Sequence, residues 1–210
     1  MALDLEEQEQ LAEFKAWWKQ YGSLITTAIV AACLAFAAWQ GWRWYERSQA
    51  AQAGGLYDTL ARAALAGDAK ALRDAGGGLL ENHPRTMFAS MGALTAARFY
   101  FERNDLKSAK AQLQWVVEHG RTDDFRDLAR LRLAQVLLDE KAYDEALKLL
   151  DEKHAAAFDA QYAAAKGDVL VAKNQAADAK AAYKLALEKA EGGNSAFRES
   201  VRMRLEALGG

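Results

Sequence analysis

The chain has 210 residues, with 27 lysine and arginine side chains, 29 aspartate and glutamate side chains, a formal net charge of −2 and one cysteine. Three of these basic and five of the acidic residues precede residue 45, so the 24 of each sign that remain leave the rest of the chain formally neutral. This balance excludes the basic excess of a nucleic-acid-binding domain. A single cysteine excludes a disulfide framework or a thiolate metal site. One proline and abundant alanine and leucine predict helices nearly throughout.

A run of 23 uncharged residues, from Gln20 to Trp42, lies between Lys19 and Arg43. As a helix the run would be roughly 34 Å long, enough to cross the hydrocarbon core of a bilayer. A single spanning segment must be helical, because only then are its backbone groups hydrogen-bonded inside lipid. The sequence therefore predicts three parts: an acidic N-terminal tail over residues 1–19, a transmembrane helix over 20–44 and a helical-repeat domain over 45–210.

Aromatic side chains gather at the two ends of this run. Tryptophan favours the headgroup zone of a membrane, because its ring is apolar while its N–H needs a polar partner. A buried helix of a soluble protein, the main alternative for an apolar run, has no need of aromatic residues at both ends. We therefore predict six membrane-interface anchors: Trp17, Trp18, Tyr21, Trp39, Trp42 and Trp44.

Two further interpretations of the run fit the sequence less well. A cleavable signal peptide needs a positively charged start, whereas the first 13 residues hold five acidic side chains. Val30 to Cys33 resembles a lipobox, but a lipid-modified cysteine should end the apolar region, and Cys33 is followed by Leu34, Ala35 and Phe36. We interpret Cys33 as a small apolar residue within the membrane helix.

Charge near the run does not set the direction in which the chain crosses the membrane. Lys15 and Lys19 precede the run, and Arg43 and Arg47 follow it. Orientation follows the bias of lysine and arginine between the two sides, and acidic residues contribute little. Both topologies are therefore open on this ground.

Alanines recur at helical spacing inside the run. Pairs of small residues four positions apart let a partner helix approach closely in a membrane. Alanine as mere filler of an apolar segment is the alternative. The candidate helix-packing face consists of Ala28, Ala31, Ala32 and Ala35.

After the run, apolar residues recur at three- and four-residue spacing, which predicts paired helices rather than strands. Ala109, Ala146 and Ala179, one in each of three pairs, are 37 and 33 residues apart. These intervals bracket the 34-residue tetratricopeptide period. Such small residues suit positions where the two helices of a pair approach too closely for a larger side chain. We expect an all-α fold in which an α-hairpin solenoid of the tetratricopeptide type follows the membrane helix.

The two ends of this array are expected to differ from its middle. Residues 51–83 look like a poorer helical pair, interrupted by the triplet Gly76-Gly77-Gly78. Residues 195–208 predict a capping helix that completes the core. Its apolar face would consist of Phe197, Val201, Leu205 and Leu208.

In tetratricopeptide arrays the first helix of each pair lines an inner groove. Offsets counted from the small residues Ala97, Ala134 and Gly167 land on apolar positions, and an exposed apolar patch usually marks an interaction surface. Packing of these residues under the first pair or the capping helix is the alternative. The candidate partner-binding groove consists of Leu94, Phe101, Leu128, Leu131, Leu138 and Val171.

No motif of catalysis or of cofactor binding stands out. The glycine triplet lacks the Lys-Ser/Thr and the preceding strand of a phosphate loop. His83, His119 and His154 are spaced by about one repeat, too far apart to share a metal ion. We therefore expect no catalytic residue, no metal and no cofactor, and an interaction protein rather than an enzyme.

Three segments resemble a known family. Residues 41–45 (GWRWY), 131–136 (LRLAQV) and 146–151 (ALKLLD) are similar to the YfgM-like ancillary subunits of the Sec translocon, and the order of features agrees over essentially the whole chain. The resemblance implies a single-pass bacterial inner-membrane protein with a cytoplasmic N-terminus and a periplasmic tetratricopeptide-like domain.

The same resemblance implies partners. They are the SecYEG translocon, the membrane-anchored periplasmic chaperone PpiD and, in addition, newly translocated client proteins that the family is thought to help onward. It implies no catalytic residue. A helical-repeat adaptor for another envelope assembly or for a stress-signalling complex, with the same fold and anchor, is the alternative function.

Overall fold

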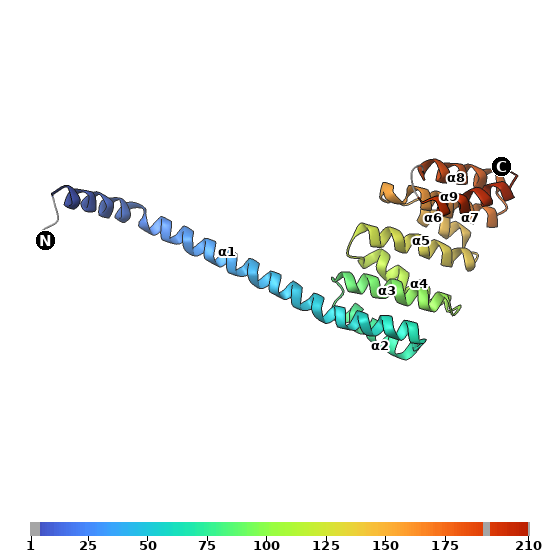
Figure 1. Cartoon of the computed structure of the whole chain (residues 1–210), viewed down its shortest axis with the longest axis horizontal. Coiled ribbons are helices and arrows are strands. Elements are labelled where there is room, and N and C mark those ends of the chain that lie inside the picture. Colours follow the sequence, from blue (N-terminus) through green and yellow to red (C-terminus); the bar gives the residue numbers. More distant parts are fainter. Residues whose placement is uncertain (1–4, 191–193, 210) are drawn as a thin grey trace. The chain divides into compact units, whose positions relative to one another are not determined.

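A computed structural model of the protein describes residues 5–190 and 194–209, with side chains from Gln10 onward. Within these ranges every regular element is a helix (Figure 1), which confirms the predicted all-α fold class. The elements are α1 (Leu5–Ala66), α2 (Ala69–Asn82), α3 (Met87–Phe101), α4 (Leu106–His119), α5 (Asp123–Asp139), α6 (Tyr143–Leu150), the 3-10 helix η1 (Ala156–Phe158), α7 (Asp159–Ala172), α8 (Ala176–Lys189) and α9 (Ser195–Ala207).

The chain divides into two units, residues 1–49 and residues 50–210. Among the described residues, α1 is the one helix that is long and apolar enough to cross a membrane, and it lies near the N-terminus. The two threonines of its apolar run bond to their own helix: the Thr26 hydroxyl donates to the Gly22 carbonyl at 2.7 Å and the Thr27 hydroxyl to the Ser23 carbonyl at 2.8 Å. Neither hydroxyl therefore needs a partner from outside the helix.

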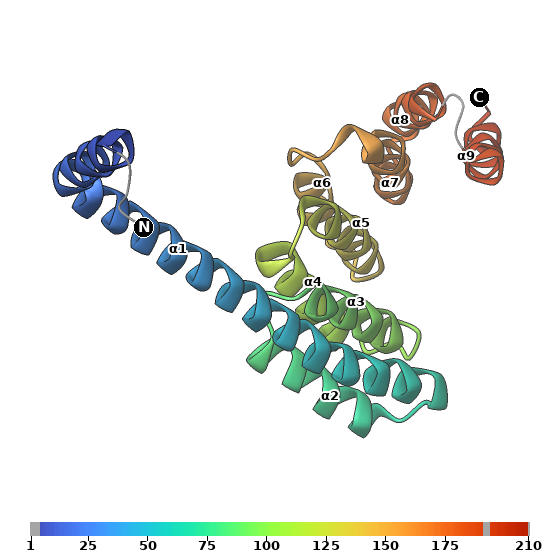
Figure 2. The same cartoon turned by 60° about the vertical axis from the view of Figure 1, so that its left-hand side comes forward.

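The second unit is built of helical pairs that follow one another in chain order (Figures 1 and 2). The last turns of α1 pair with α2, where Leu60 and Leu56 of α1 lie against the glycines of α2. The next pairs are α3 with α4, α5 with α6 and α7 with α8. The first helices of successive pairs also meet, since α3 contacts α5 and α5 contacts α7. Each pair thus buries its apolar face against its neighbours, as in a solenoid of helical repeats.

Small residues allow the close approach within each pair. Ala109, Ala146 and Ala179, which the repeat spacing singled out, are each fully buried. Gly167 of α7 lies directly under the ring of Tyr183 of α8, where a Cβ atom would come within 2.6 Å of the ring carbon Cδ1 and closer still to Cε1. The Tyr183 hydroxyl donates to Asp168 at 2.8 Å, and Arg204 of α9 donates to the same carboxylate at 2.8 and 2.9 Å.

The turns that join the two helices of each pair share one geometry. Gly67, Asn104, Lys141 and Asn174 have positive φ, between 58° and 77°. Each donates its N–H to the carbonyl three residues back, and the next residue donates to the carbonyl five residues back, as in Asp105 N–H to the Tyr100 carbonyl at 2.9 Å. These are the two bonds of a Schellman motif. Its recurrence at equivalent positions is a second sign of the repeat, independent of the buried alanines.

The predicted interruption of the first pair at its glycine triplet is wrong, because α2 runs through it. Asp68 caps the N-terminus of α2 by accepting the N–H groups of Lys70 and Ala71 at 3.0 Å. Leu72 and Leu79, before and after the triplet, are fully buried on one face of the helix. Capping and burial thus outweigh the low helix propensity of glycine, which costs about 1 kcal/mol per residue.

The core falls into two clusters. The larger extends from the last turns of α1 to α7, and the smaller lies between α7, α8 and α9. The predicted capping face of α9 is confirmed, since Val201 is 1% exposed and the other three residues are half-buried against the smaller cluster: Phe197, Leu205 and Leu208. The α9 helix therefore covers the last repeat.

Candidate functional site

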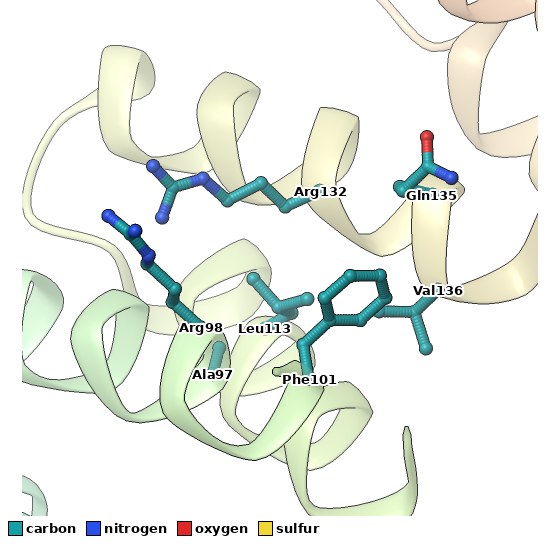
Figure 3. A pocket seen from close by; sticks show the side chains of 7 residues that line it. All are labelled: Ala97, Arg98, Phe101, Leu113, Arg132, Gln135 and Val136. Atoms are coloured by element: carbon teal, nitrogen blue, oxygen red, sulfur yellow. The ribbon is translucent and has the colours of Figure 1, made fainter. Parts of the chain in front are cut away.

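A pocket of about 330 Å³ opens between α3 and α5, the first helices of two successive pairs (Figure 3). Phe101 of α3 and Val136 of α5 face each other across it, with Leu113 of α4 beside them. Two arginines lie side by side at one end, and Gln135 lies at the other end. The lining residues are Ala97, Arg98, Phe101, Leu113, Arg132, Gln135 and Val136.

The six residues of the predicted groove occupy different environments. Phe101 is the one that lines this pocket. Leu94 is 6% exposed and belongs to the core, so its side chain offers almost no surface to a partner. Three others are half-buried and packed against the core, namely Leu128, Leu131 and Leu138. Val171, at 39% exposure, lies on the surface of α7. That these residues form a partner-binding groove stays a prediction.

Sequence reasoning missed the polar residues of the pocket. Arg98 lies four positions after Leu94, and Arg132 lies four positions after Leu128, so each continues the same helical stripe as a residue of the predicted groove. The predicted groove contains apolar residues only, and therefore neither arginine. Arginine on a stripe otherwise made of leucine and phenylalanine was the signal available in the sequence.

The two arginines differ in their partners. Arg98 donates from Nε to Glu102 at 2.7 Å, and this bond raises the pKa of Arg98. Burial lowers the pKa of Arg132, and the positive charge of Arg98 lowers it further. Within the described ranges no carboxylate lies at ion-pair distance from Arg132. The end of the pocket that they share is therefore positively charged.

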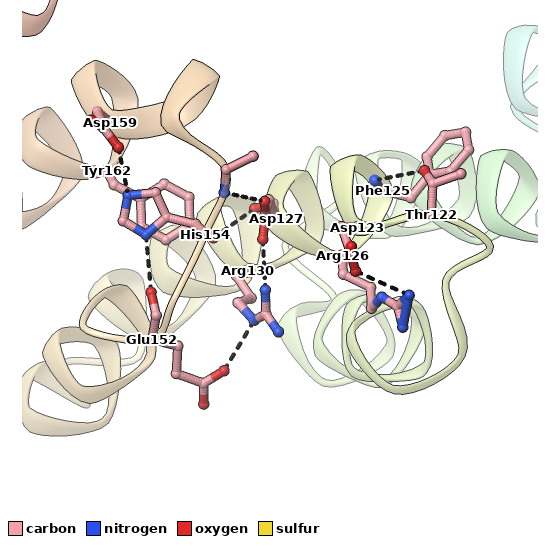
Figure 4. A network of polar contacts seen from close by, with 11 residues as sticks. Thr122, Asp123, Phe125, Arg126, Asp127, Arg130, Glu152, His154, Asp159 and Tyr162 are labelled. Atoms are coloured by element: carbon pink, nitrogen blue, oxygen red, sulfur yellow. Dashed lines mark hydrogen bonds and ion pairs between the residues drawn. The ribbon is translucent and has the colours of Figure 1, made fainter.

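A second cluster of polar residues joins α5 to the connection between α6 and α7 (Figure 4). Asp127 of α5 is 2% exposed, and its carboxylate accepts from Arg130 at 2.6 Å and from the Ala155 N–H at 2.9 Å. The Tyr162 hydroxyl donates to the Asp127 carbonyl at 3.1 Å, and burial, together with the Asp127 charge, raises the pKa of Tyr162 to about 12. The buried carboxylate is thus paired and hydrogen-bonded, as its burial requires.

His154 completes this cluster from the same connection. Its ring stacks on Tyr162 with centroids 3.8 Å apart, its Nδ1 lies 2.9 Å from the Glu152 carbonyl, and its Nε2 lies 3.4 Å from Asp159. Arg130 also reaches Glu152 at 3.0 Å. These contacts run between neighbouring repeats, so the cluster holds α7 against α5.

The other two histidines lie elsewhere. His83 is buried at the C-terminus of α2, and His119, near the end of α4, stacks on Trp115 with centroids 5.2 Å apart. Across the described part of the chain, no group of three histidine, cysteine, aspartate or glutamate side chains is arranged to hold a metal ion.

The residues predicted to act in the membrane all lie on α1 and are exposed. The aromatic anchors are 43 to 71% exposed, and neighbours among them are in ring contact, as Trp17 is with Tyr21, whose ring is tilted by 44° at a centroid distance of 5.9 Å. The four alanines of the helix-packing face are exposed as well: Ala28, Ala31, Ala32 and Ala35. Their roles as anchors and packing face stay predictions, as does the division into tail, membrane helix and domain.

Comparison with known proteins places these features in a family. A family described as a tetratricopeptide repeat-like domain matches residues 15–210. Curated relatives described as ancillary SecYEG translocon subunits match nearly end to end. The protein of Neisseria gonorrhoeae is 31% identical over 99% of this chain and 100% of its own length. The protein of Haemophilus influenzae is 26% identical over 99% of this chain and 100% of its own length. The protein of Escherichia coli K12 is 23% identical over 96% of each chain.

No solved structure matches the chain significantly. The family assignment therefore rests on the sequence matches, and the helical pairs of the structure agree with it. The similarity covers the apolar run of α1 as well as the repeats. The chain belongs to the family of ancillary SecYEG translocon subunits, whose tetratricopeptide repeat-like domain it carries.

Proposed function

We propose that the protein is a non-enzymatic, membrane-anchored scaffold of the Sec translocon. It binds SecYEG and a PpiD-like periplasmic chaperone, and it assists the passage and folding of newly translocated proteins. The observation that carries the proposal is the similarity to ancillary SecYEG translocon subunits, which extends over 96 to 99% of the chain. The pocket between α3 and α5 supports a role in binding, because it is an apolar concavity on a repeat array.

The proposed location is the bacterial inner membrane, with the N-terminus in the cytoplasm and the C-terminal domain in the periplasm. The candidate span in α1 supports one crossing, and the direction rests on the family resemblance. Protease added to spheroplasts should trim the protein down to its anchor while a cytoplasmic marker stays intact. Cleavage of the domain only after lysis would refute this topology.

Co-purification tests the scaffold. After extraction in mild detergent, tagged full-length protein should recover SecYEG and the chaperone. Recovery of a different envelope assembly in their place would identify an adaptor of another kind and refute the proposal.

Phe101→Glu tests the groove in the same experiment. Phe101 is half-buried and lines the pocket, so the variant should lose the chaperone or client while its Tm barely moves. Leu185→Glu is the matched control, because Leu185 lies on α8 outside the pocket and is 45% exposed. A loss of folding in Phe101→Glu would show instead that Phe101 is a core residue, since a buried unpaired charge costs several kcal/mol.

A further inference from the structure

The pocket between α3 and α5 combines an apolar wall with a positively charged end. Phe101, Leu113 and Val136 supply the wall, and the guanidinium groups of Arg98 and Arg132 lie beside one another at one end (Figure 3). Two positive charges this close together repel each other unless an anion binds between them. The pKa of Arg132 is lowered mainly by burial, and the positive charge of Arg98 lowers it further.

Among the described residues, one carboxylate lies at ion-pair distance from these arginines, and it is weakly held. Glu102 bonds to Arg98 alone, and the two side chains are 52 and 74% exposed. Exposed ion pairs of this kind contribute little to stability. Among the described residues Arg132 has no carboxylate at ion-pair distance, so a second carboxylate would balance its charge. A guanidinium group is well suited to bind a carboxylate, because its planar fork donates two parallel hydrogen bonds to the two carboxylate oxygens.

We propose that this pocket binds a segment of a partner protein in which a carboxylate side chain lies close to a large apolar side chain. The carboxylate lies between Arg98 and Arg132, and the apolar side chain lies against Phe101 and Val136. A volume of about 330 Å³ is at the lower end for ligand pockets, so it receives one or two side chains rather than a whole domain. This inference rests on the proposed function, because it names the chemistry of the segment bound by the same groove.

The far end of the pocket favours a peptide over a fatty acid. Gln135 lies there, opposite the two arginines. Its amide both donates and accepts hydrogen bonds, as a peptide backbone also does. An acyl chain offers no such partner at that end.

A capped octapeptide provides the probe. It carries one glutamate and one phenylalanine separated by a serine, with glycine and serine elsewhere, so that the glutamate is its only charge. Binding to the full-length protein in detergent is followed by fluorescence anisotropy of a labelled peptide up to millimolar concentration. Three altered peptides accompany it, with glutamine in place of glutamate, lysine in place of glutamate, and serine in place of phenylalanine.

The wild-type protein should bind the parent peptide about tenfold more tightly than the glutamine peptide, the usual effect of removing a charge-assisted hydrogen bond. Arg132→Gln should weaken the parent peptide about tenfold and abolish this preference, with no change in Tm. Arg98→Gln should act in the same direction. Arg85→Gln is the matched control, because it removes the same charge from an exposed residue that lies before α3. It should leave binding unchanged.

Equal affinity of the wild type for the glutamate and glutamine peptides would overturn the inference. An Arg132→Gln variant whose affinity for both peptides falls by the same factor would overturn it as well. Uptake of laurate that depends on Arg132, without peptide binding, would assign the pocket to an acyl carboxylate and overturn it too. If these results appear while SecYEG still co-purifies and Phe101→Glu still loses the chaperone, the ligand assignment fails and the proposed function stands. Loss of co-purification in the wild type would refute the function itself.

Discussion

Gly167→Ala should destabilise the last helical pair although alanine is the better helix former. The added methyl carbon would lie 2.6 Å from Cδ1 of Tyr183 and 2.9 Å from Cζ. The ring therefore has to move, and overpacking of this kind costs about 1–3 kcal/mol. Tyr183 is 2% exposed and cannot shift into open space.

Moving the ring also breaks the hydrogen bond from the Tyr183 hydroxyl to Asp168, which measures 2.8 Å. Hydrogen bonds to charged groups contribute about 1.5–3 kcal/mol. The higher helix propensity of alanine offsets about 1 kcal/mol. The expected net loss is therefore about 3 kcal/mol, which corresponds to a fall in Tm of roughly 6–12 °C for a domain of this size.

Thermal unfolding followed by circular dichroism at 222 nm measures this change on the full-length protein in detergent. Gly77→Ala on α2 is the matched control, because nothing lies within 4 Å of the Cβ it would add. It should raise stability by about 0.5–1 kcal/mol. In a Tyr183→Ala background, Gly167→Ala should no longer destabilise. A Tm for Gly167→Ala equal to that of the wild type would refute the close approach of the two helices.

Four further changes test other parts of the structure. Lys141→Gly should stabilise the protein by about 1 kcal/mol, because Lys141 has a φ of 61° and glycine adopts this conformation without strain; an unchanged or lower Tm would contradict the Schellman geometry. Folding raises the pKa of Tyr162 from 10 to about 12, so its contribution is complete below pH 10 and is lost as the pH rises to 12. The free energy of unfolding of the wild type should therefore fall by about 2–3 kcal/mol over this pH range relative to that of Tyr162→Phe. The same pH dependence of unfolding in both proteins would contradict this. Residues 48–210 alone should fold as a soluble helical domain that keeps its circular dichroism in the presence of a chelator; an unfolded fragment, or loss of helix on chelation, would be the contrary result. Replacing residues 20–44 with an unrelated membrane helix should weaken association with SecYEG if the alanine face packs on a partner, whereas unchanged co-purification would reduce the segment to a tether.

Features that depend on local pattern could be predicted from the sequence. The buried positions of Ala109, Ala146 and Ala179 follow from spacing alone, because each repeat needs a small residue where its helices meet. The capping face around Val201 follows from helical periodicity. The glycine triplet was misjudged, because propensity is a weak prior and the burial of Leu72 and Leu79 decides the outcome.

The site was predictable only in part. Phe101 was found by its offset from Ala97, but Leu94, at an equivalent kind of position, turned out to lie in the core. Whether a side chain on the first helix of a pair is open or covered depends on the next pair, whose placement no local pattern encodes. That Arg98 and Arg132 line one pocket is likewise a relation between repeats, because the two residues are 34 positions apart in the chain.

The order in which the helices pack affects how the domain assembles during synthesis. Because each helix meets mainly the next one along the chain, a pair can fold as soon as its second helix has been made, without waiting for distant partners. The exception is the smaller core cluster, which also needs α9, the last helix among the described residues. Until then α7 and α8 cover each other, but the apolar side on which Val201 of α9 packs has no cover. A nascent chain that stalls before residue 195 therefore presents this apolar surface for chaperones and proteases to recognise.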